Sequence, residues 1–364
     1  MKSKWQAQKL SEILKVRNGY AFDSKSFSNS GGLPLIRIRD LKNGTTTEIN
    51  YVGIYDKKFE VKAGDFLIGM DGEFGCYEWK GEIALLNQRV CRLQDFKGLD
   101  AKFLFYGINK YLKEIEDFTS FTTVKHISSK QIENIEFYYP ESQKEQKRIV
   151  GILDEVFEGV AKAKENVEGN LRNVSEVFEA YLQSVFANCK DGWEEKSFDK
   201  VCVLQRGFDL PTRLRKEGSH PLVSSNGITD RINLWKVKAP GVVTGRSGTI
   251  GNIHFIEENF WPLNTALYIK DFCGNDEKLI FYFLRQIDLG KYSSGAGVPT
   301  LNRNNVHCVK VFFPKSLSEQ KSIVTKLDAL STETKKLEAI YKTKLNHLEE
   351  LKKSILKKAF NGEL

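Results

Sequence analysis

The chain has little of what marks an exported, membrane-spanning or metal-binding protein. Its 364 residues include six cysteines and five histidines, and no two cysteines form a Cys-x-x-Cys pair. Disulfide frameworks and zinc sites usually need such spacing, so we expect reduced cysteines used for packing and no bound metal. No apolar run reaches the length of a bilayer span, and Met1 to Leu14 lacks a signal-peptide core. We therefore expect a cytoplasmic protein.

Proline is also scarce, and the composition is that of a folded protein. Hydrophobic residues make up 41% of the chain, with 24 Phe and only 8 Pro, which argues against disorder. A chain of this length suits two domains plus additional segments. The net charge of +8 is too modest to establish nucleic-acid binding by itself. The organisation of the sequence is more informative than its composition.

The sequence contains one unit written twice. The segment from Trp5 to Phe22 returns from Trp193 to Leu210, with aromatic and glycine positions at the same spacing. Further on, KAGDFLIGMDGEFG (62–75) returns as KAPGVVTGRSGTIG (238–251), and three glycines recur in register. An internal repeat of this kind predicts two copies of one structural unit.

The second half of the unit repeats as well. Leu86-Asn87 is paired with Leu263-Asn264, and each copy then reaches two aromatic residues followed by a proline, at Pro140 and Pro314. A Glu-Gln-Lys triplet follows in both copies and opens a long segment without proline. In these segments apolar residues recur every three or four positions, which predicts long amphipathic helices.

Each copy therefore predicts a globular lobe followed by a helix. We expect lobe 1 at 1–140, a central helix at 141–189, lobe 2 at 190–314 and a C-terminal helix at 315–364. Short Val, Ile, Phe and Tyr runs between glycine turns predict mixed α/β lobes. The narrow apolar stripe of each helix needs a partner, and the other helix of the same chain is the nearest candidate. The residues expected to pack in this antiparallel coiled coil are Ile149, Leu153, Val156, Val160, Val167, Leu171, Val174, Ile323, Leu327, Leu330, Leu337, Leu345 and Leu348.

Two similar lobes joined to a stiff spacer suit the recognition of two DNA half-sites. Some 45 helical residues span roughly 65 Å, and half-sites one helical turn apart are separated by about 34 Å. We expect the helices to set this distance. Because the lobes differ in sequence, the expected target is bipartite and asymmetric.

Basic and amide side chains occur where loops are expected in both lobes. Arginine and asparagine can pair with the edges of guanine and adenine, although solvated surface charge explains part of the set equally well. The Arg246-Ser247 pair beside the second glycine motif has no basic counterpart in the first copy, where Met70-Asp71 stands. A tight turn is therefore the expected common role of the glycines. The residues expected to contact DNA are Arg37, Arg39, Lys42, Asn43, Thr123, Lys125, Arg206, Arg213, Arg215, Arg246, Ser247, Thr300, Asn302 and Arg303.

The order of these features resembles the specificity subunits of Type I restriction–modification systems over nearly the whole chain. The features are Trp-x4-Leu/Phe near each start, the Gly-x2-Gly-x2-Gly turn, the aromatic-aromatic-Pro ending and the Glu-Gln-Lys opening of a long helix. The resemblance implies that the lobes are target recognition domains and that the helices dock two modification subunits. It implies that those methyltransferase subunits bind S-adenosylmethionine and methylate adenine, and that restriction subunits, which are translocases and nucleases, cleave unmodified DNA.

The residues themselves agree with a non-catalytic chain that binds no cofactor of its own. The sequence contains neither the Asn/Asp-Pro-Pro-Tyr/Phe signature of a methyltransferase nor a Gly-x4-Gly-Lys-Ser/Thr loop for ATP. A nucleophilic hydrolase has no motif support. Two alternatives stay open: a coiled-coil adaptor whose lobes bind protein, and the specificity component of another class of restriction system.

Overall fold

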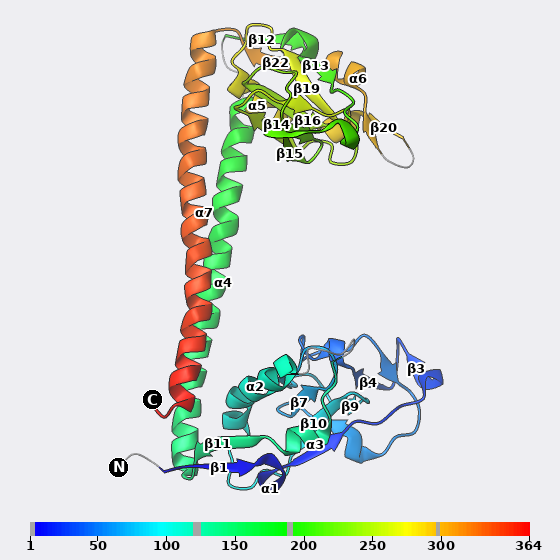
Figure 1. Cartoon of the computed structure of the whole chain (residues 1–364), viewed down its shortest axis with the longest axis vertical. Helices are drawn as coiled ribbons and strands as arrows, with labels where there is room; N and C mark the ends of the chain where they lie inside the picture. Colours follow the sequence, from blue (N-terminus) through cyan, green and yellow to red (C-terminus); the bar gives the residue numbers. More distant parts are fainter. Residues whose placement is uncertain (1–3, 119–124, 188–191, 296–298) are drawn as a thin grey trace. The chain divides into compact units, whose positions relative to one another are not determined.

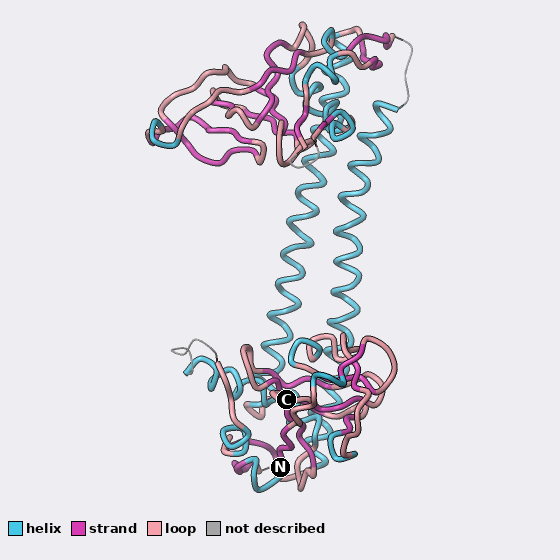
Figure 2. Tube along the Cα trace, turned by 90° about the vertical axis from the view of Figure 1, so that its right-hand side faces the viewer, coloured by secondary structure: helices cyan, strands magenta, loops and turns pink. Residues whose placement is uncertain are grey.

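The computed structural model describes residues 4–118, 125–187, 192–295 and 299–364 (Figure 1). The chain forms two compact units, Met1–Asn166 with Leu345–Leu364, and Val167–Lys344. Each unit holds one lobe together with the parts of the two long helices that pack on it. Figure 2 shows the two long helices in cyan and the strands and loops of the lobes in magenta and pink. No helix in the described ranges combines the length and the apolar character that a bilayer span needs.

Lobe 1 is built from small sheets with short helices around them. The sheets have the strand orders β2-β10-β7-β8, β3-β5-β4-β9-β6 and β1-β11. The helices are α1 (Leu10–Ile13), α2 (Ala101–Phe118) and α3 (Ser129–Glu133). The strands are β1 (Trp5–Lys9), β2 (Lys15–Asn18), β3 (Phe27–Ser28), β4 (Leu33–Ile36), β5 (Asn50–Tyr51), β6 (Glu60–Val61), β7 (Phe66–Gly69), β8 (Gly75–Glu78), β9 (Ala84–Leu86), β10 (Val90–Gln94) and β11 (Glu136–Pro140).

Lobe 2 repeats this plan with differences at its periphery. Its sheets have the strand orders β13-β19-β16-β17, β15-β14-β18, β20-β21 and β12-β22. The helices are α5 (Glu277–Gln286) and α6 (Arg303–His307). The strands are β12 (Trp193–Ser197), β13 (Val203–Arg206), β14 (Glu217–Ser224), β15 (Gly227–Ile232), β16 (Gly241–Gly245), β17 (Ile253–Ile256), β18 (Trp261–Pro262), β19 (Ala266–Asp271), β20 (Ser293–Ser294), β21 (Thr300–Leu301) and β22 (Lys310–Pro314).

The predicted tandem repeat is confirmed by the strand pairing. The order β2-β10-β7-β8 in lobe 1 corresponds strand by strand to β13-β19-β16-β17 in lobe 2. The first and last strands of each lobe also pair in the same register, with Trp5 opposite Pro140 and Trp193 opposite Pro314. Both lobes combine antiparallel and parallel pairs with helices, so the mixed α/β prediction is confirmed as well.

One detail of the predicted repeat is wrong by a single residue. In lobe 1 the Tyr20 N–H donates to the Leu86 carbonyl at 3.0 Å. In lobe 2 the equivalent Phe208 N–H donates to the Pro262 carbonyl at 2.8 Å. Leu86 therefore corresponds to Pro262 and not to Leu263. Shared residue letters suggested the other pairing, whereas the backbone hydrogen bonds decide which positions are equivalent.

The first repeated glycine is required by a close approach of two backbone segments. A Cβ on Gly19 would lie 2.0 Å from the carbonyl oxygen of Asn87, and a Cβ on Gly207 would lie 2.2 Å from that of Leu263. Both oxygens belong to backbone that cannot move aside cheaply. Only glycine lets the two segments meet at this point.

The two long helices, α4 (Gln143–Ala187) and α7 (Leu317–Phe360), run antiparallel. The ammonium of Lys164 lies 3.0 Å from a Glu349 carboxylate oxygen, and the Ser175 hydroxyl donates to Glu338 at 3.2 Å. The two contacts are eleven residues apart on each helix, in opposite directions along the chain. The predicted antiparallel pairing of the helices is confirmed.

The apolar stripe of each helix does more than pair the helices. Ile149 and Leu153 lie in the hydrophobic core of lobe 1, and Ile323 and Leu327 lie in that of lobe 2. Between these ends Val160 is buried, but Leu337 is 41% exposed. The other stripe residues are half-buried: Val156, Val167, Leu171, Val174, Leu330, Leu345 and Leu348. The stripe thus joins each helix to a lobe at its ends and leaves the middle partly uncovered.

A buried glutamine at the start of each long helix connects that helix to the lobe before it. Gln146 has no exposed surface, and its Oε1 accepts the Asp100 N–H at 2.6 Å. Its Nε2 donates to the carbonyls of Gly98 at 3.0 Å and Pro140 at 2.8 Å. Asp100 in turn caps α2 by accepting the Phe103 N–H. One side chain therefore holds a helix cap, a turn and the last strand of the lobe.

Gln320 makes the same connection in lobe 2. Its Oε1 accepts the Asp276 N–H at 2.8 Å, and its Nε2 donates to the Asn275 side chain at 2.8 Å and the Pro314 carbonyl at 2.9 Å. Asp276 caps α5 through the Leu279 N–H. The repeated Glu-Gln-Lys triplet is thus explained by its central residue.

We expect the free energy of unfolding to fall by about 1–3 kcal/mol in the Gln146→Ala and Gln320→Ala variants, because each leaves buried backbone groups unpaired. Chemical denaturation of the whole chain measures the effect. The exposed neighbours supply matched controls, Lys147→Ala and Lys321→Ala, which should change the value by no more than about 0.5 kcal/mol. Equal effects in the glutamine and lysine variants would contradict the role given to the buried amides.

Candidate nucleic-acid interface

Five of the residues predicted to contact DNA line one cleft in lobe 2. The open cleft has a volume of about 540 Å³. Its lining consists of Gln205, Arg206, Arg246, Leu267, Ser294, Thr300, Leu301, Asn302 and Arg303. These residues come from the end of β13, the segment after β16, β19, β20, β21 and the start of α6. Sequence positions nearly one hundred residues apart are brought to one place by the sheet.

Secondary structure and backbone hydrogen bonds fix the backbone positions of the three arginines of the cleft. Arg206 is the last residue of β13, and Arg246 directly follows β16. The Leu301 N–H donates to the Arg246 carbonyl at 2.7 Å, which ties β21 to this point. Asn302 caps α6 by accepting the Asn304 N–H at 3.0 Å, and Arg303 is the first residue of that helix.

The arginines of the cleft keep most of their donors available. Arg246 and Arg303 each donate to a single backbone carbonyl, those of Asn264 and Leu204, both at 3.4 Å. Arg206 lies 3.5 Å from the carboxylate of Asp209 and is half exposed. A guanidinium has five N–H donors, so the described contacts of this cleft leave several donors on each arginine for a ligand. Three such groups together suit phosphates or the acceptor-rich edge of guanine.

The glycine motif beside the cleft is a turn, as predicted. Gly72 in lobe 1 and Gly248 in lobe 2 adopt φ angles of 76° and 89°. An L side chain rarely adopts this left-handed conformation. A Cβ on Gly72 would meet nothing within 4 Å, so conformation and not crowding requires glycine there.

In lobe 1, the predicted DNA contacts of the segment 37–43 are largely engaged with the protein itself. The Arg37 guanidinium donates to Glu48 at 2.9 Å and is also 3.6 Å from Asp40, with only 18% of its side chain exposed. Arg39 contacts the same Glu48 carboxylate at 3.4 Å. These two arginines are therefore partly neutralised within the lobe.

The next two residues of that segment also have partners. The Lys42 ammonium lies 2.7 Å from a Glu73 carboxylate oxygen, and this hydrogen bond raises the pKa of Lys42. The Asn43 amide donates to Thr46 at 2.6 Å and accepts from Thr45 at 2.8 Å. Binding of DNA by this segment would have to replace these contacts.

The remaining predicted contacts are dispersed. Arg215 donates to the Leu210 carbonyl at 3.1 and 3.0 Å, Arg213 is exposed, and Lys125 pairs with Glu116 at 3.1 Å. Ser247 forms an isolated β-bridge with Thr300 next to the cleft. Thr123 lies outside the described residues.

Sequence reasoning overlooked a charged cluster in lobe 1 that occupies the position of the cleft. It consists of Asp71, Arg89 and His126, with the His126 Nδ1 2.6 Å and the Arg89 Nε 3.5 Å from the two Asp71 carboxylate oxygens. The signal that could have found it was the repeat itself, since His126 aligns with Thr300. Runs of basic residues point to other segments of the lobe instead.

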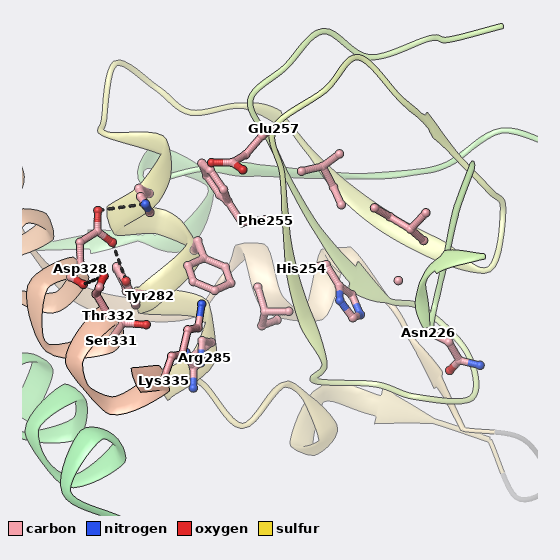
Figure 3. Close-up of a pocket in the computed structure, with 16 residues that line it drawn as sticks. Asn226, His254, Phe255, Glu257, Tyr282, Arg285, Asp328, Ser331, Thr332 and Lys335 are labelled. Atoms are coloured by element: carbon pink, nitrogen blue, oxygen red, sulfur yellow. Dashed lines mark hydrogen bonds and ion pairs between the residues drawn. The ribbon is translucent and has the colours of Figure 1, made fainter. Parts of the chain in front are cut away.

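A second hollow in unit 2 lies where lobe 2 meets α7, and its polar side chains connect the lobe to this helix (Figure 3). The Tyr282 hydroxyl donates to Asp328 at 2.6 Å, and Lys278 lies 2.9 Å from the same carboxylate. Burial and the carboxylate raise the pKa of Tyr282, which keeps the hydroxyl protonated as a donor. In unit 1, Tyr106 and Lys102 contact Asp154 in the same way. Both lobes are thus held to their helix by a matching Lys–Tyr–Asp set.

The same hollow contains a histidine without a partner on one nitrogen. The Nε2 atom of His254 is buried and forms no hydrogen bond, and burial lowers the pKa of His254. In the described ranges, no group of three or more His, Cys, Asp or Glu side chains is arranged to hold a metal ion.

Comparison with known proteins covers nearly the whole chain. The specificity subunit of the Type I restriction enzyme EcoBI from Escherichia coli is 27% identical over 417 residues, which span 99% of this chain and 86% of that subunit. The specificity subunit of the Type I restriction enzyme MjaVIII from Methanocaldococcus jannaschii is 25% identical over 189 residues, 49% of this chain and 44% of that subunit.

Solved structures show the same fold. A chain from work on the complex assembly and conformational transition of the type I R-M system aligns over 100% of both chains, with a TM-score of 0.78 and 17% identity. The HsdS subunit from Thermoanaerobacter tengcongensis aligns over 99% of this chain and 97% of that chain, with a TM-score of 0.58 and 18% identity.

The family profile matches both copies of the repeat. The profile is described as the Type I restriction modification DNA specificity domain, and it matches residues 2–168 and 190–350. Each match contains one lobe and most of the helix that follows it. The chain therefore belongs to the Type I restriction–modification DNA specificity family, and its two lobes are the DNA-recognition domains of a specificity subunit.

Proposed function

We propose that each lobe reads one half of an asymmetric, bipartite DNA target, and that lobe 2 does so through its arginine cleft. The observation that carries this proposal is the convergence of Arg206, Arg246 and Arg303 from three separate elements on one open cleft. Among the described residues Arg246 and Arg303 form no ion pair, and Arg206 has only the exposed Asp209 at 3.5 Å, whereas the arginines of the segment 37–43 share Glu48. Arginine can read guanine through two parallel hydrogen bonds or bind a phosphate.

The chemistry would be supplied by partner subunits. In this proposal two modification subunits bind S-adenosylmethionine and methylate adenine in the target, restriction subunits cleave unmodified DNA, and this chain contributes recognition without catalysis. Its similarity to a chain described in the complex assembly of the type I R-M system supports such partners.

The paired helices offer a surface for those partners. Apolar side chains on their outer faces are exposed in unit 2, among them Val177 (57%) and Ile340 (49%). Tyr181 follows Val177 by four residues on α4 and Leu337 precedes Ile340 by three on α7, so each helix has two exposed apolar neighbours on one face. Exposed apolar surface that is contiguous commonly marks a protein interface. We assign the docking of the modification subunits to these faces of α4 and α7.

The helices would also set the spacing between the half-sites. Both run without interruption, over 45 residues in α4 and 44 in α7. A continuous helix resists bending and compression because its backbone hydrogen bonds connect each turn to the next. Such a pair can act as a spacer of defined length.

Loss of a cleft arginine should weaken binding to the half-site of lobe 2. We expect Arg246→Ala and Arg303→Ala to reduce affinity about tenfold to one-hundredfold, with relaxed specificity at one base pair if the contact is to a base edge. A contact to phosphate should instead lower the salt dependence of binding by about one unit of slope. Titration of labelled target duplex with the complex of this chain and its methyltransferase measures both.

The matched control for charge is Lys238→Ala, which removes an exposed cation of lobe 2 away from the cleft. Its affinity should stay close to that of the unchanged protein. Equal weakening by Lys238→Ala and Arg246→Ala would contradict a specific role for the cleft.

Shortening both helices by matched segments should shorten the spacer and leave both half-sites unchanged. Removal of 165–171 together with 342–348 keeps the Lys164–Glu349 and Ser175–Glu338 contacts on either side of the cut. Seven residues correspond to about 10 Å of helix, or about three base pairs of DNA. Sequencing of methylated adenines in cells carrying the shortened chain reads the spacer directly. An unchanged spacer would refute the role of the helices.

Charges placed on the exposed apolar faces should prevent partner docking. We expect the double variant Val177→Asp with Ile340→Asp to abolish co-purification of the methyltransferase subunits, because burying an unpaired carboxylate in the interface costs free energy. The chain itself should stay folded, since both sites are exposed. The exposed polar sites Gln183→Asp with Asn346→Asp serve as the control. If the control variant also loses the methyltransferase, or the test variant retains it, docking does not use these faces.

A further inference from the structure

Lobe 1 has the same backbone frame as the cleft of lobe 2. The Ile127 N–H donates to the Met70 carbonyl at 2.8 Å, as the Leu301 N–H donates to the Arg246 carbonyl at 2.7 Å. Both hydrogen bonds tie the segment before the last short helix of the lobe to the residue that follows the central strand. The two lobes therefore present equivalent surfaces at this place.

The side chains on that frame differ between the lobes. An isolated β-bridge joins Asp71 to His126 in lobe 1, and the equivalent bridge joins Ser247 to Thr300 in lobe 2. The final residue of β13, Arg206, has an amide counterpart in lobe 1, Asn18. A carboxylate and an imidazole in lobe 1 thus take the place of the Ser247 and Thr300 hydroxyls of lobe 2.

The lobe 1 cluster is compact and accessible. The His126 Nδ1 lies 2.6 Å from one carboxylate oxygen of Asp71, and the Arg89 Nε lies 3.5 Å from the other. The side chains of Asp71, His126 and Arg89 are 27%, 41% and 56% exposed. A ligand can therefore reach the carboxylate and the guanidinium side by side.

Stability does not account for this cluster. Ion pairs as exposed as these contribute little to folding, because water screens the charges and the long side chains lose freedom. In addition, Arg89 has a φ of 70°, in the left-handed region that disfavours residues with a side chain. Backbone strain of this kind is often found at functional sites.

The side chains of the cluster match the hydrogen-bonding groups of one kind of base pair. A carboxylate accepts a hydrogen bond from the amino group of cytosine, and a guanidinium donates to the O6 and N7 atoms of guanine. A cytosine–guanine pair presents this donor and these acceptors next to each other in the major groove. Phosphate would repel Asp71, so a backbone contact fits the cluster less well than a base contact.

We infer that Asp71, Arg89 and His126 determine the base specificity of lobe 1 by reading a cytosine–guanine pair, with Asp71 on cytosine and Arg89 on guanine. His126 holds the carboxylate in place and is a positioning residue. The inference rests on the proposed function, in which lobe 1 reads one half-site. It moves the reading site of lobe 1 from the segment 37–43 to the counterpart of the arginine cleft.

Selection from randomised DNA tests this assignment. The purified complex of the full chain with its methyltransferase selects duplexes from a library randomised over both half-sites, and the bound fraction is sequenced. We expect Asp71→Asn to lower the preference for cytosine at one position of one half-site about tenfold to one-hundredfold, and to favour adenine there. Arg89→Gln should lower the preference for guanine at the same base pair. The other half-site and the spacer should not change.

Two further variants make the result decisive. Glu73→Gln removes an exposed carboxylate two residues away and should leave the selected sequence unchanged. Asp71→Glu keeps the carboxylate and should restore the cytosine preference if Asp71→Asn binds too weakly to be selected. Unaltered half-sites in both Asp71→Asn and Arg89→Gln, or failure of Asp71→Glu to restore the preference, would overturn the inference. Failure of the unchanged complex to select any bipartite sequence would instead refute the proposed function.

Discussion

The buried amide at the start of each long helix is the constraint on which the rest of each unit depends. An amide without solvent must find protein partners for both its donors and its acceptor. Gln146 and Gln320 find them only when a helix cap, a turn and the last strand of the lobe are all in place. Each lobe and the start of the helix that follows it therefore depend on each other. The Lys–Tyr–Asp sets and the apolar helix ends also connect each helix to its lobe.

Because the junction holds the frame of each lobe, the residues proposed to contact DNA can differ between the two lobes. Both lobes have the same four-stranded sheet. They also share the close backbone approach at Gly19 and Gly207 and the turn at Gly72 and Gly248. The residues that project from this frame are not under the same packing constraint. Arginines gather in the cleft of lobe 2, and a mixed Asp–Arg–His cluster occupies the equivalent place in lobe 1. Two similar scaffolds can thus recognise different halves of one target.

The lobe 1 segment rich in basic residues shows what composition alone leaves out. Arg37 and Arg39 look available in the sequence, but Glu48 contacts both of them and so partly neutralises their charge. The sequence indicates the cleft residues of lobe 2 one by one, in loop-like segments, whereas their convergence depends on strand order. Strand order follows from contacts between distant parts of the chain, which a single sequence does not display.

The tandem repeat, the mixed lobes, the antiparallel helix pair and the family resemblance can all be predicted from the sequence, because each leaves a regular pattern of residue types along the chain. The folded structure is needed to show which positions of the two copies are equivalent around Leu86 and Pro262, which charges are paired, and that Asp71, Arg89 and His126 meet. Those outcomes depend on backbone hydrogen bonds and on side-chain contacts across long stretches of sequence. Periodicity records which face of an element is buried, but it contains no information about what lies opposite that face.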